Sequence, residues 1–434
     1  MGRIVRLLFL VFLLLISFSC RKDSDITPPS IDLNSPVENA QYQVPAEIPV
    51  IGTVYDEISL KAIRIQLLDE NMVPAGQAVH ITPEENSYSI NQSLVIDNIL
   101  LDPGIYFLHV QASDGVQATN RYVKIYLNEA PRELKCYIAV TRSNSTLRIY
   151  RISPDFNDSL VLSRTSDYLG SSMMNDYGLF FISGSYNGSC TAYDVNTWQM
   201  QWEVPVTIDP PFAWFTGFYV NSPYLWLGYR SGKFEKYDAY GAIKMSVNTH
   251  TGFAPLKFCL AGDKLVSEEK NPFGVDREIV VHYEFSGVVH DELFITDPVT
   301  ALLPLAEDKL CMISNAGTAD ALWQAFDVPS ASVWTPPSNF DPGKVNAALR
   351  VDDFILAAHE DGIYRLLTGN YNLLMMTPGL NSAALAYDRV NRRILAADGT
   401  SVRFYSDQWP VVTLQQTIPL GDTVIAIHCV YNKD

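Results

Sequence analysis

The side chains that could perform catalysis or bind a metal are few and scattered along this 434-residue sequence. Of its seven histidines, only His250, His290 and His359 lie outside expected strands and outside the expected first domain, and none has HxxxH or HExxH spacing. Because that spacing places two imidazoles on one helix face, a metal site here would require assembly in three dimensions. No GxSxG, P-loop or GxGxxG motif in strand–helix context occurs. We therefore expect no resident cofactor or metal and assign no catalytic residue.

Hydrolysis of a polysaccharide would need two carboxylates that face each other. Glu268, Glu360 and Asp361 qualify only by their expected position in loops. The His359-Glu360-Asp361 run is typical of a solvated turn rather than of part of a catalytic triad. The sequence therefore favours a protein that is not an enzyme.

The cysteines predict neither a disulfide framework nor a zinc site. After Cys20 the sequence has five cysteines, an odd number, and no CxxC pair: Cys136, Cys190, Cys259, Cys311 and Cys429. Buried thiols in a hydrophobic core are the favoured interpretation.

The charge balance excludes one class of partner. The sequence has 31 basic and 48 acidic side chains, which give a net charge of −17. Nucleic-acid binding requires a basic surface, so we expect no nucleic-acid partner. With 23 Tyr and 20 Phe, the composition favours β-sheets.

Residues 1–19 have the pattern of a signal peptide. Arg3 and Arg6 precede the ten-residue apolar run Leu7–Ile16, which is short for a membrane span. The small residues that follow lead to Cys20 and resemble a bacterial lipobox, in which the cysteine thiol receives a lipid. The polar tether over residues 20–29 resembles that of Bacteroidota surface lipoproteins. A plain secretory signal with an incidental cysteine is the alternative.

That resemblance implies an outer-membrane or cell-surface protein held to the membrane through its N-terminal lipid alone. The mature chain would carry a charge near −19, since cleavage removes two of the positive charges.

Residues 30–130 are predicted to form a β-sandwich. Six or seven short strand-forming runs, such as Leu60–Leu68, are separated by turn residues. The runs around Gly52-Thr53-Val54-Tyr55-Asp56 and Gly104-Ile105-Tyr106 resemble bacterial Ig-like domains, which usually act as spacers or contact surfaces. Asp56, Glu57 and Asp114 could form a calcium site, but turn formation by Asp is the favoured interpretation.

Residues 134–434 repeat a two-strand pattern with a period of about 40–45 residues, which predicts a seven-bladed β-propeller. A hydrophobic strand recurs in each repeat, and a polar turn then leads to a second strand with an aromatic or large apolar residue. These marker residues are Tyr150, Tyr193, Tyr237, Tyr283, Phe326, Leu366 and Tyr405.

The C-terminal run Val424–Cys429 matches the innermost strand of a repeat, but no second strand follows it. Its expected partner is Cys136–Val140, so the C-terminal strand would complete the first blade and remove an open edge. Cys136 and Cys429 would then lie in adjacent strands, as the one pair to test for a disulfide. Two free thiols are favoured.

The second repeat resembles the repeat of quinoprotein-like propellers. Tyr193-Asp194, Thr197 and Trp202 match that pattern, whereas Trp198 replaces its glycine. The Asp is expected to cap the turn between outer strands and Trp202 to pack between blades. These residues support the fold rather than a quinone cofactor.

In a propeller, the loops that lead into the innermost strands share one face with the turns between second and third strands. This face is expected to carry aromatic rings among amides and charged groups, a combination that suits sugar rings. The alternative is that the rings fold back onto the blade edges. The residues selected as a binding site are Tyr186, Trp214, Arg230, Glu268, Trp334, Phe340 and His359.

Taken together, the sequence predicts an all-β cell-envelope lipoprotein with an Ig-like sandwich and a propeller. Its expected function is binding or scaffolding, with a glycan or an envelope protein as the partner. One alternative is a propeller enzyme that acts on polysaccharide, as a lyase or hydrolase. Another is an envelope-assembly scaffold similar to the quinoprotein-like lipoprotein of outer-membrane protein insertion.

Overall fold

The computed structural model describes residues 27–207, 212–317 and 320–434, and the signal peptide and Cys20 lie outside these ranges. The chain divides into two compact units, Met1–Pro131 and Arg132–Asp434. Apart from one short 3-10 helix (Asn175–Tyr177), the regular elements of the described residues are β-strands. Within those residues, no helix has the length and apolar character that a membrane crossing requires.

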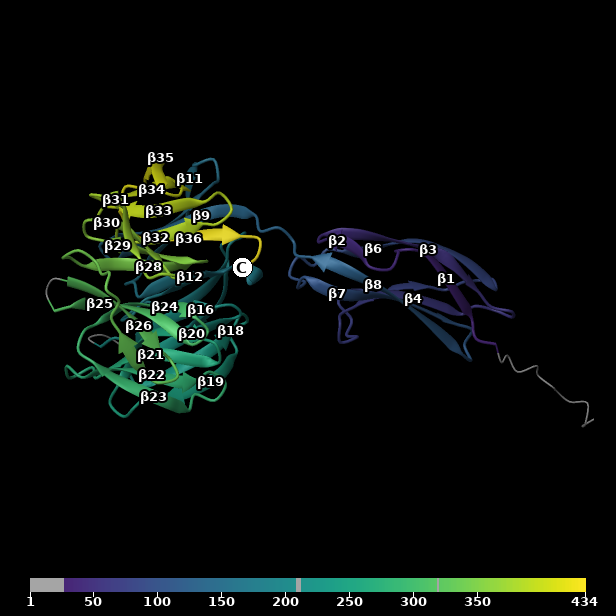
Figure 1. The fold of residues 1–434 in the computed structure, drawn as a ribbon, viewed down its shortest axis with the longest axis horizontal. Helices are drawn as coiled ribbons and strands as arrows, with labels where there is room; N and C mark the ends of the chain where they lie inside the picture. The colour runs from purple at the N-terminus through teal and green to yellow at the C-terminus, as the bar shows by residue number, and fades with distance from the viewer. Residues whose placement is uncertain (1–26, 208–211, 318–319) are drawn as a thin grey trace, which may run out of the picture. The chain divides into compact units, whose positions relative to one another are not determined.

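The first unit consists of two sheets, one with the strand order β1-β3-β6 and one with the order β2-β8-β7-β4-β5 (Figure 1). Its strands are β1 (Ser30–Ser35), β2 (Ala40–Gln43), β3 (Ala46–Tyr55), β4 (Ala62–Leu68), β5 (Val79–Ile81), β6 (Ser87–Ile96), β7 (Gly104–Ser113) and β8 (Ala118–Asn128).

The two sheets of the first unit enclose one hydrophobic core. In β3 buried and exposed residues alternate, so that Ile48, Val50 and Val54 point inward. This period of two places one apolar face of each sheet against the other. The sandwich architecture expected from the sequence is therefore present.

Aspartates shape two turns of this unit. Asp56 Oδ1 accepts the backbone N–H groups of Ile58 and Ser59, both at 2.8 Å. Asp114 Oδ1 accepts two backbone N–H groups in the turn between β7 and β8 in the same way, each at 2.6 Å. These bonds agree with the interpretation of the aspartates as turn residues.

The described residues of the second unit form seven four-stranded antiparallel sheets. In hydrogen-bonded order, sheet 1 is β36 (Thr423–Tyr431), β9 (Leu134–Ser143), β10 (Thr146–Ile152) and β11 (Asp158–Thr165); sheet 2 is β12 (Gly170–Met174), β13 (Leu179–Ser183), β14 (Cys190–Asp194) and β15 (Met200–Val204); sheet 3 is β16 (Phe215–Asn221), β17 (Tyr224–Tyr229), β18 (Lys233–Asp238) and β19 (Ile243–Asn248). Sheet 4 is β20 (Ala254–Ala261), β21 (Lys264–Lys270), β22 (Arg277–Tyr283) and β23 (Val289–Ile295); sheet 5 is β24 (Val299–Ala306), β25 (Lys309–Ala316), β26 (Asp320–Asp327) and β27 (Ser332–Trp334). Sheet 6 is β28 (Val345–Val351), β29 (Phe354–His359), β30 (Gly362–Leu367) and β31 (Leu373–Pro378); sheet 7 is β32 (Leu385–Asp388), β33 (Arg393–Asp398), β34 (Ser401–Gln408) and β35 (Val411–Pro419).

The sheets form a closed ring. Strands β36, β12, β16, β20, β24, β28 and β32, one from each sheet, contact one another in this cyclic order, and β32 returns to β36. This arrangement is a β-propeller in which those strands are innermost. The recurring hydrophobic runs of the sequence form the second strands, and the seven marker residues lie in the third strands.

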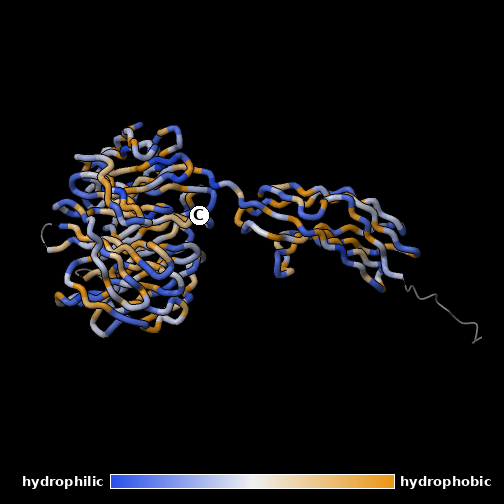
Figure 2. Tube along the Cα trace, in the orientation of Figure 1, coloured by the Kyte–Doolittle hydropathy of each residue, from blue (hydrophilic) through white to orange (hydrophobic). Residues whose placement is uncertain are grey.

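Hydrophobic clusters fill the spaces between neighbouring sheets, and apolar residues recur along the strands of the ring (Figure 2). Each cluster takes its buried residues mainly from two adjacent sheets. Phe181 of sheet 2 and Phe215 of sheet 3, for example, belong to one cluster. Both faces of each sheet are therefore covered, which explains why the second strands are continuously apolar rather than alternating.

The C-terminal strand closes the first sheet, as the sequence predicts. β36 pairs antiparallel with β9, and Cys136 lies opposite Val430 while Cys429 lies opposite Tyr137. The two cysteines are thus one register position apart, and they pack into different hydrophobic clusters. Their thiols are free, because side chains on opposite faces of a strand pair cannot reach each other.

The second-sheet motif also behaves as expected. Asp194 Oδ1 accepts the backbone N–H groups of Asn196 and Thr197, at 3.0 and 2.8 Å. Trp202 Nε1 donates to the carbonyl oxygen of Ala239 in sheet 3, at 2.9 Å. Trp198 has a φ of 58°, the left-handed conformation that the glycine of the pattern would adopt without strain.

A chain that ends at Leu420, and so lacks β36, is expected to lose the cooperative unfolding transition of the ring. Without β36, β9 has an open edge and the cluster between sheets 7 and 1 loses one wall. Thermal unfolding followed by near-UV circular dichroism measures this. A synthetic peptide of residues 421–434 should restore the transition, and a scrambled peptide should not. An unchanged melting curve for the shortened chain would contradict the closing role of β36.

Candidate functional site

The loop face of the ring consists of the segments that lead into the innermost strands and the turns between second and third strands. The register of sheet 4 illustrates it: Ala254 at the start of β20 pairs with Lys270 at the end of β21, which pairs with Arg277 at the start of β22. Tyr186, Trp214, Arg230 and Phe340 lie in such segments or turns. The four residues therefore share this face, as the sequence predicts.

Asp167 holds the turn that presents Tyr186. Its carboxylate accepts four backbone N–H groups, from Ser185 and Tyr186 at 2.7 Å, from Asn187 at 3.1 Å and from Gly188 at 3.0 Å. Burial by itself would raise the pKa of Asp167, but these hydrogen bonds outweigh it and the pKa is lowered. Tyr186 is 46% exposed at the tip of this turn.

Trp214 is partly buried and packs into the edge of sheet 3. Its ring makes an edge-on contact with Tyr229, with centroids 5.8 Å apart. The Tyr229 hydroxyl donates to Glu235 at 2.7 Å, and the Tyr237 hydroxyl also contacts this carboxylate. Trp214 therefore belongs to the structural edge of the sheet, which is the alternative that the sequence left open for these rings.

Arg230 lies between two exposed aromatic rings. Its guanidinium carbon is 4.6 Å from the ring centroid of Phe212 and 5.0 Å from that of Phe273. The two phenylalanines are 50% and 84% exposed, respectively. Within the described ranges, the guanidinium forms no ion pair with a carboxylate. In the described part of the chain, the guanidinium is thus held by cation–π contacts rather than by a counter-ion.

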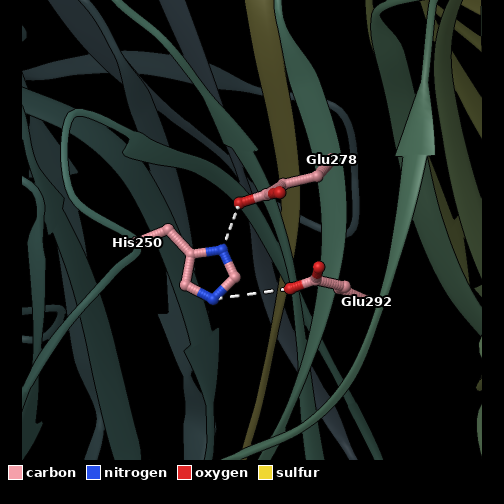
Figure 3. Close-up of side chains that lie close together, drawn as sticks. All are labelled: His250, Glu278 and Glu292. Carbon is pink, nitrogen blue, oxygen red and sulfur yellow. Dashed lines mark hydrogen bonds and ion pairs between the residues drawn. The ribbon is translucent and has the colours of Figure 1, made fainter.

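The segment that enters β20 brings His250 between two glutamates (Figure 3). The distance from His250 Nδ1 to Glu278 Oε1 is 2.8 Å, and that from Nε2 to Glu292 Oε2 is 3.5 Å. The Glu278 side chain is 2% exposed, whereas those of His250 and Glu292 are 38% and 41% exposed. Burial raises the pKa of Glu278, although His250 opposes the shift. Within the described ranges, this group is the single histidine–carboxylate cluster compact enough to hold a metal ion.

Glu268 lies inside the protein, which corrects its expected position on the loop face. It is 1% exposed in β21, forms an ion pair with Arg277 and accepts the backbone N–H of Val299 at 3.1 Å. Burial raises the pKa of Glu268, against the effect of Arg277. The strand continues to Lys270, so Glu268 faces sheet 5 instead of solvent.

His359 is also buried, at 0% exposure, and not presented to solvent as expected for a solvated turn. It is the last residue of β29, and its Nδ1 contacts the Asp361 carboxylate. The Phe340 ring stacks on the imidazole with centroids 5.8 Å apart and an interplanar angle of 4°. Phe340 and His359 are therefore brought together, but as packing partners.

Trp334 is exposed, but it is not on the loop face. It lies in β27, the outermost strand of sheet 5, opposite Ala325. With Tyr371, whose ring centroid is 5.5 Å away, it lines a surface cavity of about 270 Å³ together with Lys309 and Asp327. The expected position was wrong because the chain forms a short outer strand before the loop that enters β28.

Sequence reasoning missed Phe273, Glu278 and Glu292. Phe273 follows Asn271-Pro272, a turn signal that places an aromatic ring at a loop tip. Glu278 lies directly before the apolar run Ile279-Val280-Val281 of β22, and an acid at the start of a buried strand is a signal of a polar partner. Glu292 has no comparable local signal.

No family model matches the sequence, and no curated protein matches it. Among solved structures, the chain is similar to a quinoprotein alcohol dehydrogenase-like protein from Bacteroides thetaiotaomicron, with 12% identity and a TM-score of 0.43 over 93% of this chain and 97% of that one. It is also similar to BamB from Moraxella catarrhalis (15% identity, TM-score 0.40, 59% of this chain and 87% of that one). The WD40 domain of Pan2 from Neurospora crassa is a further neighbour (10% identity, TM-score 0.46, 62% and 80%). Similarity at these identities concerns the β-propeller fold alone.

Replacing Asp167 with asparagine is expected to lower the free energy of unfolding at pH 7 by about 1–3 kcal/mol, because a charged acceptor of several N–H groups is lost. The pKa of Asp167 is lower in the folded chain than in the unfolded chain. The stabilising contribution is therefore present above about pH 4 and is lost as the pH falls through the folded-state value.

Urea unfolding measures the free energy of unfolding of Asp167→Asn and of the original protein. The difference between these two free energies should become smaller as the pH is lowered. Asp158→Asn, at an exposed strand position, is the control and should match the original protein. A difference in free energy of unfolding between Asp167→Asn and the original protein that is constant from pH 7 to pH 3 would contradict the stabilising role of the ionised Asp167.

Proposed function

We propose that this chain is a lipid-anchored cell-envelope protein with an Ig-like sandwich as spacer and a seven-bladed β-propeller as binding module. The loop face of the propeller binds a glycan or a partner protein. The observation that carries the proposal is the stack of Phe212, Arg230 and Phe273, which presents apolar rings and a guanidinium side by side.

The chemistry of this stack favours a sugar ligand. Flat aromatic rings pack against the apolar face of a sugar ring, and guanidinium N–H groups donate to hydroxyl or carboxylate oxygens. A phenylalanine that is 84% exposed has no role in the core, and an exposed aromatic group beside a cation is a common feature of binding surfaces. Tyr186, at 46% exposure, adds another ring on the loop face.

The envelope location rests on the lipobox-like sequence before Cys20 and on the polar tether. The first unit supports a spacer role, because its polar groups in the turns serve the fold itself, as at Asp56 and Asp114. Its two-sheet architecture is compatible with an Ig-like domain.

The polysaccharide-enzyme alternative draws less support from the loop face. Glu268 is neutralised by Arg277 inside sheet 4, and His359 is covered by Phe340. A retaining or inverting hydrolase needs two accessible carboxylates on either side of the substrate. Glu360 and Asp361, the other two candidates, are adjacent in one turn between β29 and β30, and Asp361 is paired with His359. Binding without turnover is therefore the function that we propose.

The double variant Arg230→Gln/Phe273→Ala is expected to lose at least tenfold in affinity for the ligand, since both the guanidinium and one ring of the stack are removed. Glycan-array binding and capture of envelope proteins, each with residues 24–434, measure this. Phe285→Ala is the matched control: Phe285 is 74% exposed but lies in the turn between β22 and β23, at the opposite end of the same sheet.

Binding to one glycan class that the double variant loses and the control keeps would support the proposal. Specific capture of one envelope protein with the same dependence would support the protein-partner form of it. The proposal that the loop face is the binding surface would be overturned if neither experiment detected binding. Equal binding by the double variant and the original protein would overturn it as well.

A further inference from the structure

The cluster of His250, Glu278 and Glu292 differs from the other buried acids of sheet 4. Glu268 is neutralised by Arg277, and Glu269 accepts hydrogen bonds from Ser267 at 3.0 Å and lies 3.1 Å from His282 Nε2. Glu278 has His250 as its one assigned partner in the described part of the chain. Two carboxylates thus share one imidazole, and the cluster carries excess negative charge at the protein surface.

The hydrogen bond to Glu278 determines which nitrogen of His250 carries a proton. An ionised carboxylate only accepts hydrogen bonds, so when Glu278 is ionised, Nδ1, at 2.8 Å from Glu278 Oε1, is the nitrogen that donates. In the neutral imidazole, Nε2 then presents a lone pair. This lone pair faces Glu292 Oε2 at 3.5 Å. Two acceptors that face each other repel, unless a second proton or a cation lies between them.

The spacing of these two acceptors fits a cation. An N–H···O hydrogen bond typically spans about 2.9–3.0 Å, so 3.5 Å is long for a proton-bridged pair. A zinc ion bound at about 2.1 Å from each atom in tetrahedral geometry separates nitrogen and oxygen by about 3.4 Å. Histidines that bind metal commonly donate their other N–H to a carboxylate, which is the relation of His250 to the buried Glu278.

We propose that His250 Nε2 and Glu292 Oε2 bind a divalent transition-metal ion of the Zn²⁺ class, with Glu278 as the buried carboxylate that orients the imidazole. A nitrogen ligand favours such ions over Ca²⁺ or Mg²⁺, which prefer oxygen alone. Both ligands are more than a third exposed, so an ion can enter and water completes its coordination. The inference goes beyond the proposed binding function and does not depend on it.

The position of the site makes it part of the loop face. Thr249, the neighbour of His250, donates its backbone N–H to Gly232 at 3.0 Å, in the turn that carries Arg230. The backbone N–H of His250 also points to Glu269 Oε2 at 3.3 Å. These contacts fix the segment on both sides, so a bound ion would not need the backbone to move.

Isothermal titration of the chelator-treated protein with Zn²⁺ tests the assignment. We expect one site per chain, at least tenfold weaker in His250→Gln and Glu292→Gln because each removes a ligand. In Glu278→Gln it should be about 10–100-fold weaker, because the imidazole loses its orienting carboxylate. His80→Gln is the matched control, an exposed histidine of the first unit, and its affinity should be unchanged.

Equal affinity in His250→Gln and the original protein would overturn the proposal, as would the absence of saturable binding below about 1 mM. Loss of affinity in His80→Gln alone would assign the ion to a surface histidine and overturn it as well. Because a variant could fold poorly, anomalous diffraction from zinc-soaked crystals of the original protein is the second measurement. A peak between Nε2 and Oε2 supports the site, and zinc peaks elsewhere with none there overturn it.

Discussion

The ring depends on one constraint: every sheet must have an apolar partner on each of its two faces. The hydrophobic clusters between neighbouring sheets meet this requirement all the way round, including the step from sheet 7 back to sheet 1. No single sheet can bury both faces by itself, so the sheets are stable only as a closed set. That closure rests on the pairing of β36 with β9, which joins the two ends of the ring.

The interface between sheets 3 and 4 satisfies the same constraint with fewer buried apolar residues than the other interfaces. Its cluster has four buried members among the described residues: Trp226, Phe234, Phe258 and Leu265. Partly buried apolar residues such as Met245 and Val247 pack against this cluster. Polar groups also lie at the interface, as in the ion pair of Lys236 with Glu284 and in His282, whose ring lies 5.2 Å from that of Phe234. Arg230, His250 and Phe273 emerge from the loops above this interface. The Arg230 and His250 groups thus lie above the interface that has the smallest buried apolar cluster among the described residues.

The architecture could be predicted because its signals are local. Apolar second strands, marker residues in third strands and a solitary closing strand each extend over a few residues, and the structure contains all three. The direction of a side chain is less accessible to such reasoning. Glu268 and Glu269 are adjacent in a strand covered on both faces, so both are buried although the sequence suggests a charged loop. Trp334 lies in an outer strand rather than in a loop. The His250 cluster brings together three segments whose relative positions depend on strand register and tertiary packing.

The placement of β9 has a mechanical consequence. The chain enters the ring at Leu134, and β9 is hydrogen-bonded along both edges, to β10 and to β36. A pull on the chain ahead of Leu134 therefore acts on a strand held by two ladders, whose bonds must break together in shear rather than one after another. The same pairing that completes the first sheet means that the load falls on a strand paired along both edges rather than on a free edge strand. A chain loaded at this point would keep its ring closed under tension that would peel a singly paired terminal strand.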